Sequence, residues 1–166
     1  MKVFGIVGWK NCGKTGLVER LVAEFCARGL RVSTLKHAHH AFDVDQPGRD
    51  SHRHRVAGAS EVLVAGGQRW ALMSELRGAD EPSLEALLAR LAPVDLVLVE
   101  GWKGAAIPKL AAYRAASGQA VFQDAHVVAV ASDSAVQVDV PMLDLDDTGG
   151  IADFIWAVMD TGKGAK

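Results

Sequence analysis

The residues with the most definite chemistry form the stretch 8–15, Gly-Trp-Lys-Asn-Cys-Gly-Lys-Thr. This stretch fits the phosphate-binding loop pattern G-x-x-x-x-G-K-S/T at every fixed position. Glycines in such a loop let backbone N–H groups face phosphate oxygens, and the positive end of the following helix adds a fixed field. We expect Lys14 to reach the β- and γ-phosphates, and the Thr15 hydroxyl to take a place on Mg²⁺. The predicted phosphate-binding residues are Gly8, Asn11, Cys12, Gly13, Lys14, Thr15, Gly16 and Gly101.

An acid follows the apolar run 96–99, Leu-Val-Leu-Val, which is typical of a fully buried strand. Proteins with a phosphate-binding loop hold the Mg²⁺ shell with an acid from the strand beside the loop. Glu100 has a longer reach than the usual Asp and is expected to act through water. Gly101 is expected to place its N–H near a γ-phosphate without a side-chain clash. Thr15 and Glu100 are therefore the predicted metal site.

A base-reading group is predicted at the end of a later apolar run, 127–131, which is followed by Ser132 and Asp133. A carboxylate at this kind of place accepts two hydrogen bonds from guanine, one from N1–H and one from the exocyclic amine. Adenine lacks that donor pair. Ser132 and Asp133 are the predicted guanine-binding residues.

Five of the six histidines lie between positions 37 and 54, after the predicted strand 30–35. Three interpretations stay open: a metal site of His and Asp, a switch loop that contacts the γ-phosphate and Mg²⁺, or a solvated loop. The offsets of His52 and His54 do not share a helical face, which weakens a helix-borne metal pair. The sequence leaves open whether Lys109 faces phosphate or solvent. The candidate switch or precursor-binding residues are Lys36, His37, His39, His40, Asp50, Ser51, Lys103 and Lys109.

The elements that must position these residues begin with strand 3–7, the loop, a helix over 14–28 ended by Gly29, and strand 30–35. Crossovers of this kind build parallel sheets with helices on both sides, and ligands collect at the carboxyl ends of the strands. The predicted fold is α/β, a three-layer P-loop NTPase fold with a mostly parallel sheet and an antiparallel hairpin or edge. The remaining predicted elements are a hairpin of a buried strand 61–65 with 70–74, a short helix about 49–58, a helix from Pro82, strands 96–99, 108–114, 127–131 and 140–143, and a helix 149–159.

The whole chain has 166 residues and a formal net charge of −2. The length predicts a single nucleotide-binding domain over 1–159 with a frayed tail, 160–166. The charge argues against a nucleic-acid partner, and the apolar runs are shorter than the roughly 18 residues of a membrane span. We read no signal peptide, and two cysteines make no disulfide framework, so the expected location is the cytoplasm.

Taken together, these blocks resemble the molybdopterin-guanine dinucleotide biosynthesis adaptor (MobB) family, to about residue 158. The loop differs from the usual family pattern at positions 10–12 and at Gly16, and Trp102 stands where Phe is more frequent. The segments that carry the resemblance are 8–15, 36–40 (Lys-His-Ala-His-His), 47–51 (Pro-Gly-Arg-Asp-Ser), 68–73 (Gln-Arg-Trp-Ala-Leu-Met), 96–103 (Leu-Val-Leu-Val-Glu-Gly-Trp-Lys), 108–109 (Pro-Lys) and 130–133 (Val-Ala-Ser-Asp).

The resemblance implies a GTP-binding accessory protein that uses Mg²⁺ and forms a homodimer with sheet contributed across the interface. It implies that this protein assists the guanylyltransferase that joins molybdopterin to GMP, with molybdopterin as a candidate bound precursor. It also implies that GTP hydrolysis is weak. We find no obvious Gln or Arg finger in the sequence, and the catalytic residues stay unknown.

Two other functions stay open from the sequence. The His-rich block 37–54 would also suit a metallochaperone-type GTPase. A small-molecule kinase on the same fold would need a lid with arginines, for which Arg49, Arg53 and Arg55 are the candidates.

Overall fold

The computed structural model describes residues 1–38 and 42–161. The chain divides into two compact units, which we treat separately: unit 1 comprises Met1–His37 and Leu91–Lys166, and unit 2 comprises Ala38–Arg90. The single-domain prediction over 1–159 stays a prediction. No helix among the described residues is long and apolar enough to cross a membrane.

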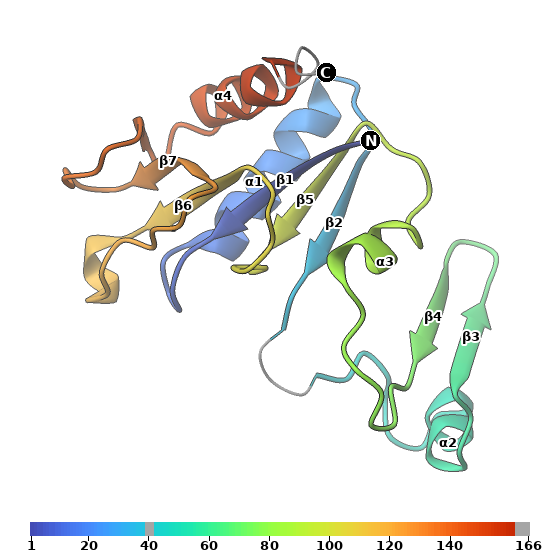
Figure 1. The fold of residues 1–166 in the computed structure, drawn as a ribbon. Helices are drawn as coiled ribbons and strands as arrows, with labels where there is room; N and C mark the ends of the chain where they lie inside the picture. The colour runs from blue at the N-terminus through green and yellow to red at the C-terminus, as the bar shows by residue number, and fades with distance from the viewer. Residues whose placement is uncertain (39–41, 162–166) are drawn as a thin grey trace. The chain divides into compact units, whose positions relative to one another are not determined.

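Unit 1 is built on a six-stranded sheet in the order β2-β5-β1-β6-β7-β8 (Figure 1). Every neighbouring pair in this sheet is parallel, so all six strands end at the same edge. The strands are β1 Lys2–Val7, β2 Val32–Lys36, β5 Leu96–Glu100, β6 Lys109–Tyr113, β7 Val127–Ser132 and β8 Met142–Asp144. Because β5 and β6 flank β1, the segments that follow them lie on either side of the loop that leaves β1.

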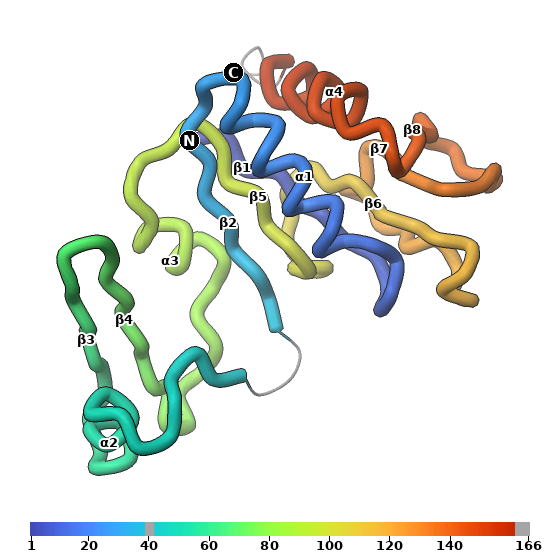
Figure 2. Tube along the Cα trace, turned by 180° about the vertical axis from the view of Figure 1, so that it is seen from behind, coloured from blue at the N-terminus to red at the C-terminus, as the bar shows by residue number. Residues whose placement is uncertain are grey.

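Two helices of unit 1, α1 Lys14–Ala27 and α4 Thr148–Thr161, pack against each other over one face of the sheet (Figure 2). The predicted apolar face of α1 is confirmed, since Leu17, Leu21 and Phe25 are buried. Gly29 ends the helix with a φ of +82°, as predicted. The helix α4 extends to Thr161, beyond the start of the predicted frayed tail 160–166, which stays a prediction, and 162–166 lie outside the described residues.

The faces of the parallel sheet alternate along each strand, as the two-residue strand period requires. Phe4 and Ile6 pack beneath the helices, whereas Val7 points to the opposite face with Ala111 and Val130. In unit 1 this second face is packed by apolar side chains from irregular segments of the chain. These side chains include Val121, Phe122, Val136, Val138 and Val140.

Unit 2 contains α2 Asp50–Val56, the strands β3 Glu61–Ala65 and β4 Trp70–Ser74, and α3 Leu84–Leu88. The predicted hairpin is confirmed, because β3 and β4 pair antiparallel. Its predicted place at the edge of a mixed sheet is wrong, because the two strands form a sheet of their own. β3 was predicted to be buried, but it buries only Val62. Trp70 is 66% exposed, so it does not pack in the core.

The predicted fold class is confirmed: an α/β chain with a mostly parallel sheet and an antiparallel hairpin. The boundaries shift only slightly, with β2 beginning at Val32 and β8 at Met142. β8 lies at the edge of the sheet, as Pro141 predicts, since proline has no N–H for a ladder. A short 3₁₀ turn, Ala115–Ser117, follows β6.

Candidate functional site

The stretch 8–15 leaves the carboxyl end of β1 and leads into α1, which is the strand–loop–helix order that the motif predicts. Gly8 has a φ of +141°, and a Cβ there would lie 2.5 Å from the carbonyl oxygen of Ala112. Gly13 has a φ of +84° and precedes the first turn of α1. Both fixed glycines are therefore required by the backbone itself, before any ligand is considered.

Lys14 and Thr15 open α1 and face different partners. The Lys14 ammonium donates a hydrogen bond of 2.6 Å to the carbonyl of Trp9, inside the loop. Burial lowers the pKa of Lys14 from its ordinary value, while the charge of Glu100 acts in the opposite direction. The Thr15 hydroxyl donates to Oε1 of Glu100 at 3.0 Å.

Glu100 reaches Thr15 because β5 pairs with β1, with Ile6 opposite Glu100 in the register. Its carboxylate is buried, and Oε1 also lies 3.2 Å from the Lys36 ammonium at the end of β2. A hydroxyl and a buried carboxylate at one point are the oxygen donors that Mg²⁺ prefers. These residues fit a Mg²⁺ site, and the predicted pair is brought together.

Gly101 follows β5 and continues its pairing with β1. Its N–H donates to the carbonyl of Ile6 at 3.0 Å, and the predicted place of this N–H near a γ-phosphate stays a prediction. The continued pairing of β5 with β1 takes this donor. The glycine is nevertheless required, because its φ is +86° and a Cβ would lie 3.1 Å from the carbonyl oxygen of His37.

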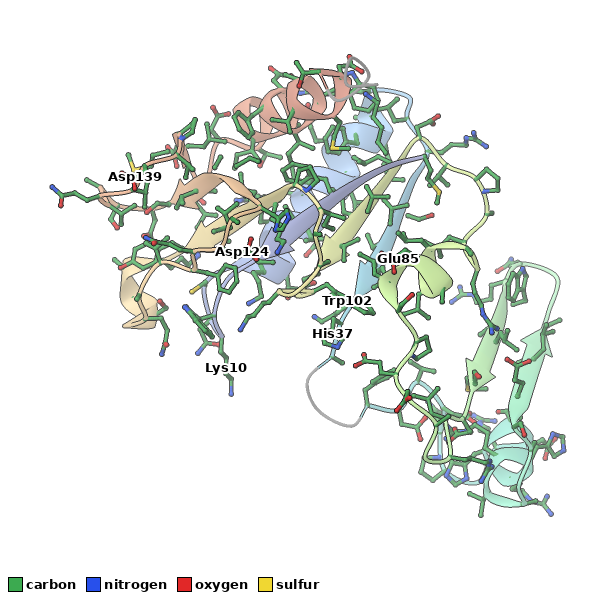
Figure 3. The ribbon with its side chains drawn as sticks, in the orientation of Figure 1. Lys10, His37, Glu85, Trp102, Asp124 and Asp139 are labelled. Carbon is green, nitrogen blue, oxygen red and sulfur yellow. The ribbon has the colours of Figure 1, made fainter. Side chains whose placement is uncertain are left out.

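Aromatic rings and a lysine cover the side of the loop next to Gly101. His37 stacks on Trp102 with 4.6 Å between ring centroids, and Figure 3 shows the two side chains next to each other. The Lys103 ammonium lies 3.8 Å from the centroid of the Trp9 ring. Phe122 meets the same ring edge-on at 5.7 Å between centroids. The loop is therefore fixed by side chains from two other segments.

Lys109 faces neither of the two environments that the sequence left open. It is fully buried and forms an ion pair with Asp124, which lowers the pKa of the Asp124 carboxyl. Its ammonium also donates to the carbonyl of Lys103. Gly5 makes room for its stem, since a Cβ there would lie 2.8 Å from Cγ of Lys109. Lys109 thus fixes the segment after Gly101 through its hydrogen bond to the Lys103 carbonyl.

The predicted guanine-binding residues lie at the carboxyl end of β7. Asp133 is exposed, and its Oδ1 accepts the N–H of Ala115 at 2.9 Å. A carboxylate has about four acceptor positions, so this bond orients Asp133 and leaves it able to accept from a base. The buried Ser132 hydroxyl instead donates to the carbonyl of Ser134 and accepts its N–H. The Ser132 side chain therefore stabilises its own turn.

The remaining loop residues of the prediction are placed as follows. Cys12 is buried, and its thiol lies 3.5 Å from the Ser117 hydroxyl. Asn11 adopts a φ of +65°, which asparagine tolerates better than most residues, and Gly16 is exposed in the first turn of α1.

Sequence reasoning missed Arg114, which directly follows β6. Its guanidinium lies beside the loop, because a Cβ at Gly13 would come within 2.7 Å of its Nε. The same side chain lies 3.8 Å from Asp146. The available signal was a cation at the carboxyl end of a strand that neighbours the loop.

The candidates of the His-rich block are divided. Lys36 and His37 belong to unit 1, whereas Asp50 and Ser51 belong to unit 2, so their predicted role as a switch at the loop stays a prediction. Ser51 donates to Asp45 at 2.9 Å. His39 and His40 lie outside the described residues.

The two other functions gain no support from the described residues. Within 1–38 and 42–161, no group of three or more His, Cys, Asp or Glu side chains is arranged to hold a metal ion. Arg55, a lid candidate for a kinase, is engaged by Asp43 at 2.7 Å and by Glu75 at 3.0 Å.

The parallel sheet, the glycine-bounded loop before α1 and the acid at the end of β5 define an α/β protein of the P-loop NTPase-like class. Residues 3–133 match the family model of MobB, molybdopterin guanine dinucleotide synthesis protein B. The chain therefore belongs to the MobB family, which confirms the resemblance seen in the sequence.

Curated relatives agree with this assignment. The chain is 41% identical over 167 residues to the molybdopterin-guanine dinucleotide biosynthesis adapter protein of Escherichia coli K12, covering 98% of this chain and 95% of that one. It is also 41% identical over 157 residues to the adapter protein of Haemophilus influenzae, with 92% and 86% covered.

Among solved structures, a MobB homolog from Bacillus stearothermophilus matches with a TM-score of 0.70 and 29% identity, covering 97% of this chain and 99% of that one. Bacillus subtilis MobB matches with a TM-score of 0.76 over 96% of this chain and 98% of that one. At 24% identity, this second match supports the fold alone.

Proposed function

We propose that this protein binds GTP with Mg²⁺ in the loop 8–15 and serves as a GTP-binding adapter in molybdopterin guanine dinucleotide biosynthesis. The observation that carries the proposal is the meeting of Thr15 with the buried Glu100 directly beside Lys14. A lysine, a hydroxyl and a carboxylate at the start of a helix are the groups that a Mg²⁺-bound triphosphate requires. The proposed pathway is inferred from the family's adapter proteins, which are named for molybdopterin-guanine dinucleotide biosynthesis.

In this proposal the chain's own groups bind and orient the nucleotide. Lys14 leaves the Trp9 carbonyl and donates to phosphate oxygens, together with N–H groups at the start of α1. Thr15 and Glu100 would hold Mg²⁺, which would neutralise phosphate charge when bound. Arg114 lies beside Gly13, where it can approach the phosphates from the β6 side.

Calorimetry with GTP, ATP and molybdopterin, each with Mg²⁺, tests the proposal directly. Lys14→Ala is expected to abolish GTP binding while the circular dichroism spectrum is unchanged. Lys10→Ala is the matched control, because Lys10 is an exposed lysine of the same loop and extends away from the sheet (Figure 3). Micromolar GTP binding by Lys14→Ala would show that the loop is not the site.

We propose that Asp133 selects guanine. Asp133→Asn replaces one acceptor oxygen by a donor, so the preference for GTP over ATP is expected to fall. Ser134→Ala serves as a control in the same turn. An unchanged ratio of GTP to ATP affinity in Asp133→Asn would remove Asp133 from the base site.

We also propose a homodimer and an interaction with the guanylyltransferase. Support for a dimer comes from the hairpin, whose apolar side chains Leu63, Val64, Trp70 and Leu72 are exposed. An isolated two-stranded hairpin is marginal in water and gains stability from an added layer. Sedimentation analysis of Trp70→Glu is expected to show monomers, and a dimer that persists would remove the hairpin from the interface.

Slow hydrolysis belongs to the same proposal. A well-placed arginine or glutamine is worth about 10³–10⁵ in rate. The sequence offers no obvious finger, and Arg114, which lies beside Gly13, has its guanidinium 3.8 Å from Asp146. Single-turnover hydrolysis with and without the guanylyltransferase measures this: the protein alone is expected to be slow. Fast steady turnover of ATP that depends on an added small acceptor would favour the kinase function instead.

A further inference from the structure

Two lysines besides Lys14 gather at the loop without a role in the proposed function. The Lys36 ammonium lies 3.2 Å from the Glu100 oxygen that also accepts the Thr15 hydroxyl. The Lys103 ammonium lies 3.8 Å from the centroid of the Trp9 ring, and Lys14 donates to the carbonyl of that same Trp9. All of these residues belong to unit 1.

The fold brings both lysines next to the segment that begins with Glu100 and Gly101. Lys36 ends β2 and stands opposite Glu100 in the register of β2 and β5. Lys103 follows Glu100 by three positions, and its carbonyl is held by the buried Lys109 ammonium. Their charges both lower the pKa of Lys14, which places the three ammonium groups in one electrostatic neighbourhood.

The site consequently carries more positive charge than its single buried carboxylate can neutralise. Lys36 is 59% exposed at its side chain, and Lys103 rests on an aromatic face. The Lys36 ammonium is paired with Glu100, but it is exposed enough to meet a phosphate oxygen as well. The contact of Lys103 with an aromatic face is weaker than a charge-assisted hydrogen bond with a phosphate oxygen. Both side chains are long and flexible, so they can turn toward a phosphate.

We propose that Lys36 and Lys103 recognise the terminal phosphate, so that the protein distinguishes a nucleoside triphosphate from a diphosphate. This inference rests on the proposed nucleotide binding at 8–15. The two lysines lie beside the segment that carries Glu100 and Gly101, next to the pair of Thr15 and Glu100 that would hold Mg²⁺. A diphosphate lacks the group that they contact and leaves their charge without a partner.

The test compares the affinity for a non-hydrolysable GTP analogue with the affinity for GDP, both with Mg²⁺, by calorimetry. Lys36→Gln and Lys103→Gln are each expected to weaken the analogue about tenfold, which corresponds to about 1.4 kcal/mol, and to leave GDP within about threefold. Lys10→Gln removes a lysine charge from the loop 8–15 itself and is expected to leave the ratio of the two affinities unchanged. Lys36→Arg is expected to retain most of the preference.

The variants separate this role from a structural one. The link from Lys109 uses the Lys103 carbonyl, which Lys103→Gln retains. If either glutamine variant weakens both nucleotides equally, that lysine shapes the loop and does not read the terminal phosphate. Unchanged affinities would overturn the inference while the proposed function stands. If the unaltered protein binds neither nucleotide, the proposed function fails and the inference fails with it.

Discussion

Different interactions stabilise the interior of each of the two units. In unit 1, apolar side chains such as Phe4, Leu98 and Ile155 are fully buried between the sheet and its helices. In unit 2, only Val62 and Leu84 are buried among the described apolar residues. In unit 2, ion pairs and hydrogen bonds to backbone carbonyls join segments that are distant in the chain.

The centre of this polar network in unit 2 is Arg55. It lies 2.7 Å from Asp43, 3.5 Å from Asp45 and 3.0 Å from Glu75. Arg77 adds hydrogen bonds to two carbonyls at the end of α2. The Arg55 side chain is 15% exposed, whereas Asp43 and Glu75 are 46% and 35% exposed, so water and salt screen this network more than they affect apolar burial.

The contrast in apolar burial between the two units indicates where rigidity and movement are expected. The candidate nucleotide site is built on unit 1, where strands and helices fix Thr15 against Glu100. Asp50 and Ser51, the predicted switch residues, belong to unit 2, where opening disrupts few apolar contacts. If the switch prediction is right, the switch residues belong to the unit whose opening disrupts fewer apolar contacts.

The largest effect is expected from Leu98→Ala, which removes a fully buried side chain of β5. Such a truncation in a packed core lowers the free energy of unfolding by about 2–5 kcal/mol. Val56→Ala in α2 is the comparable truncation in unit 2, where the residue is 74% exposed and lies outside the hairpin, and we expect at most about 0.5 kcal/mol. Urea denaturation measures both. Equal losses would contradict the comparison.

A second, smaller effect is expected at the ion pair of the buried Lys109 with Asp124 in unit 1. Lys109→Met retains the volume of the stem but leaves Asp124 without its ammonium. Because the Asp124 side chain is 22% exposed, water can compensate part of the loss, and we expect about 1–3 kcal/mol. The double variant with Asp124→Asn is expected to regain part of this. Strictly additive losses would show that the two residues do not act as a pair.

The sequence predicts unit 1 well because its signals are local and periodic. Leu17, Leu21 and Phe25 lie on one face of a helix at any reasonable choice of boundaries, and the motif assigns Lys14 and Thr15 without further knowledge. The prediction failed where the outcome depends on what covers an element. The apolar run in 61–65 indicates a buried strand, but no local signal shows that one of its faces stays open.

The candidate site, like the fold, could be predicted where its signals are local and could not be predicted where they depend on distant contacts. Glu100 was found because an acid ends a buried strand, and the register of β1 and β5 brings it to Thr15. The destination of the Gly101 N–H and the partner of Lys109 depend on contacts distant in the chain. A hint existed for Lys109, since a glycine within the apolar strand 3–7 makes room for a neighbouring side chain.

The pH dependence should separate the units further, with a smaller effect. The Lys109 ammonium lowers the pKa of Asp124, and backbone and Arg55 hydrogen bonds lower that of Asp43. A depressed folded-state pKa gives stability that is complete above the unfolded value of about 3.9 and is lost as the pH falls through the folded value. Asp124→Asn should therefore begin to converge with the unaltered protein as the pH falls below about 4, and should match it once the pH is below the folded-state pKa of Asp124.

The control for this prediction is ionic strength. The Asp43 contribution should fade in about 1 M salt, where screening acts within roughly 3 Å, while the Asp124 contribution persists. Urea titrations at several pH values measure both variants. Salt sensitivity at Asp124 equal to that at Asp43 would remove the distinction between a buried pair and an exposed one.

The smallest effect on global stability is expected from Arg55→Met, although its local effect is large. Removing the guanidinium leaves Asp43, Asp45 and Glu75 close together without their cation, so the network of unit 2 loses its centre. Hydrogen exchange is expected to accelerate over 43–59 and at the β3–β4 hairpin, while amides of β1 and β5 keep their protection. Lys36→Met is the matched control, because it removes a cation from a carboxylate in unit 1. If Arg55→Met instead accelerates exchange equally in both units, they open together, and ion pairing in unit 2 contributes to the stability of the whole chain.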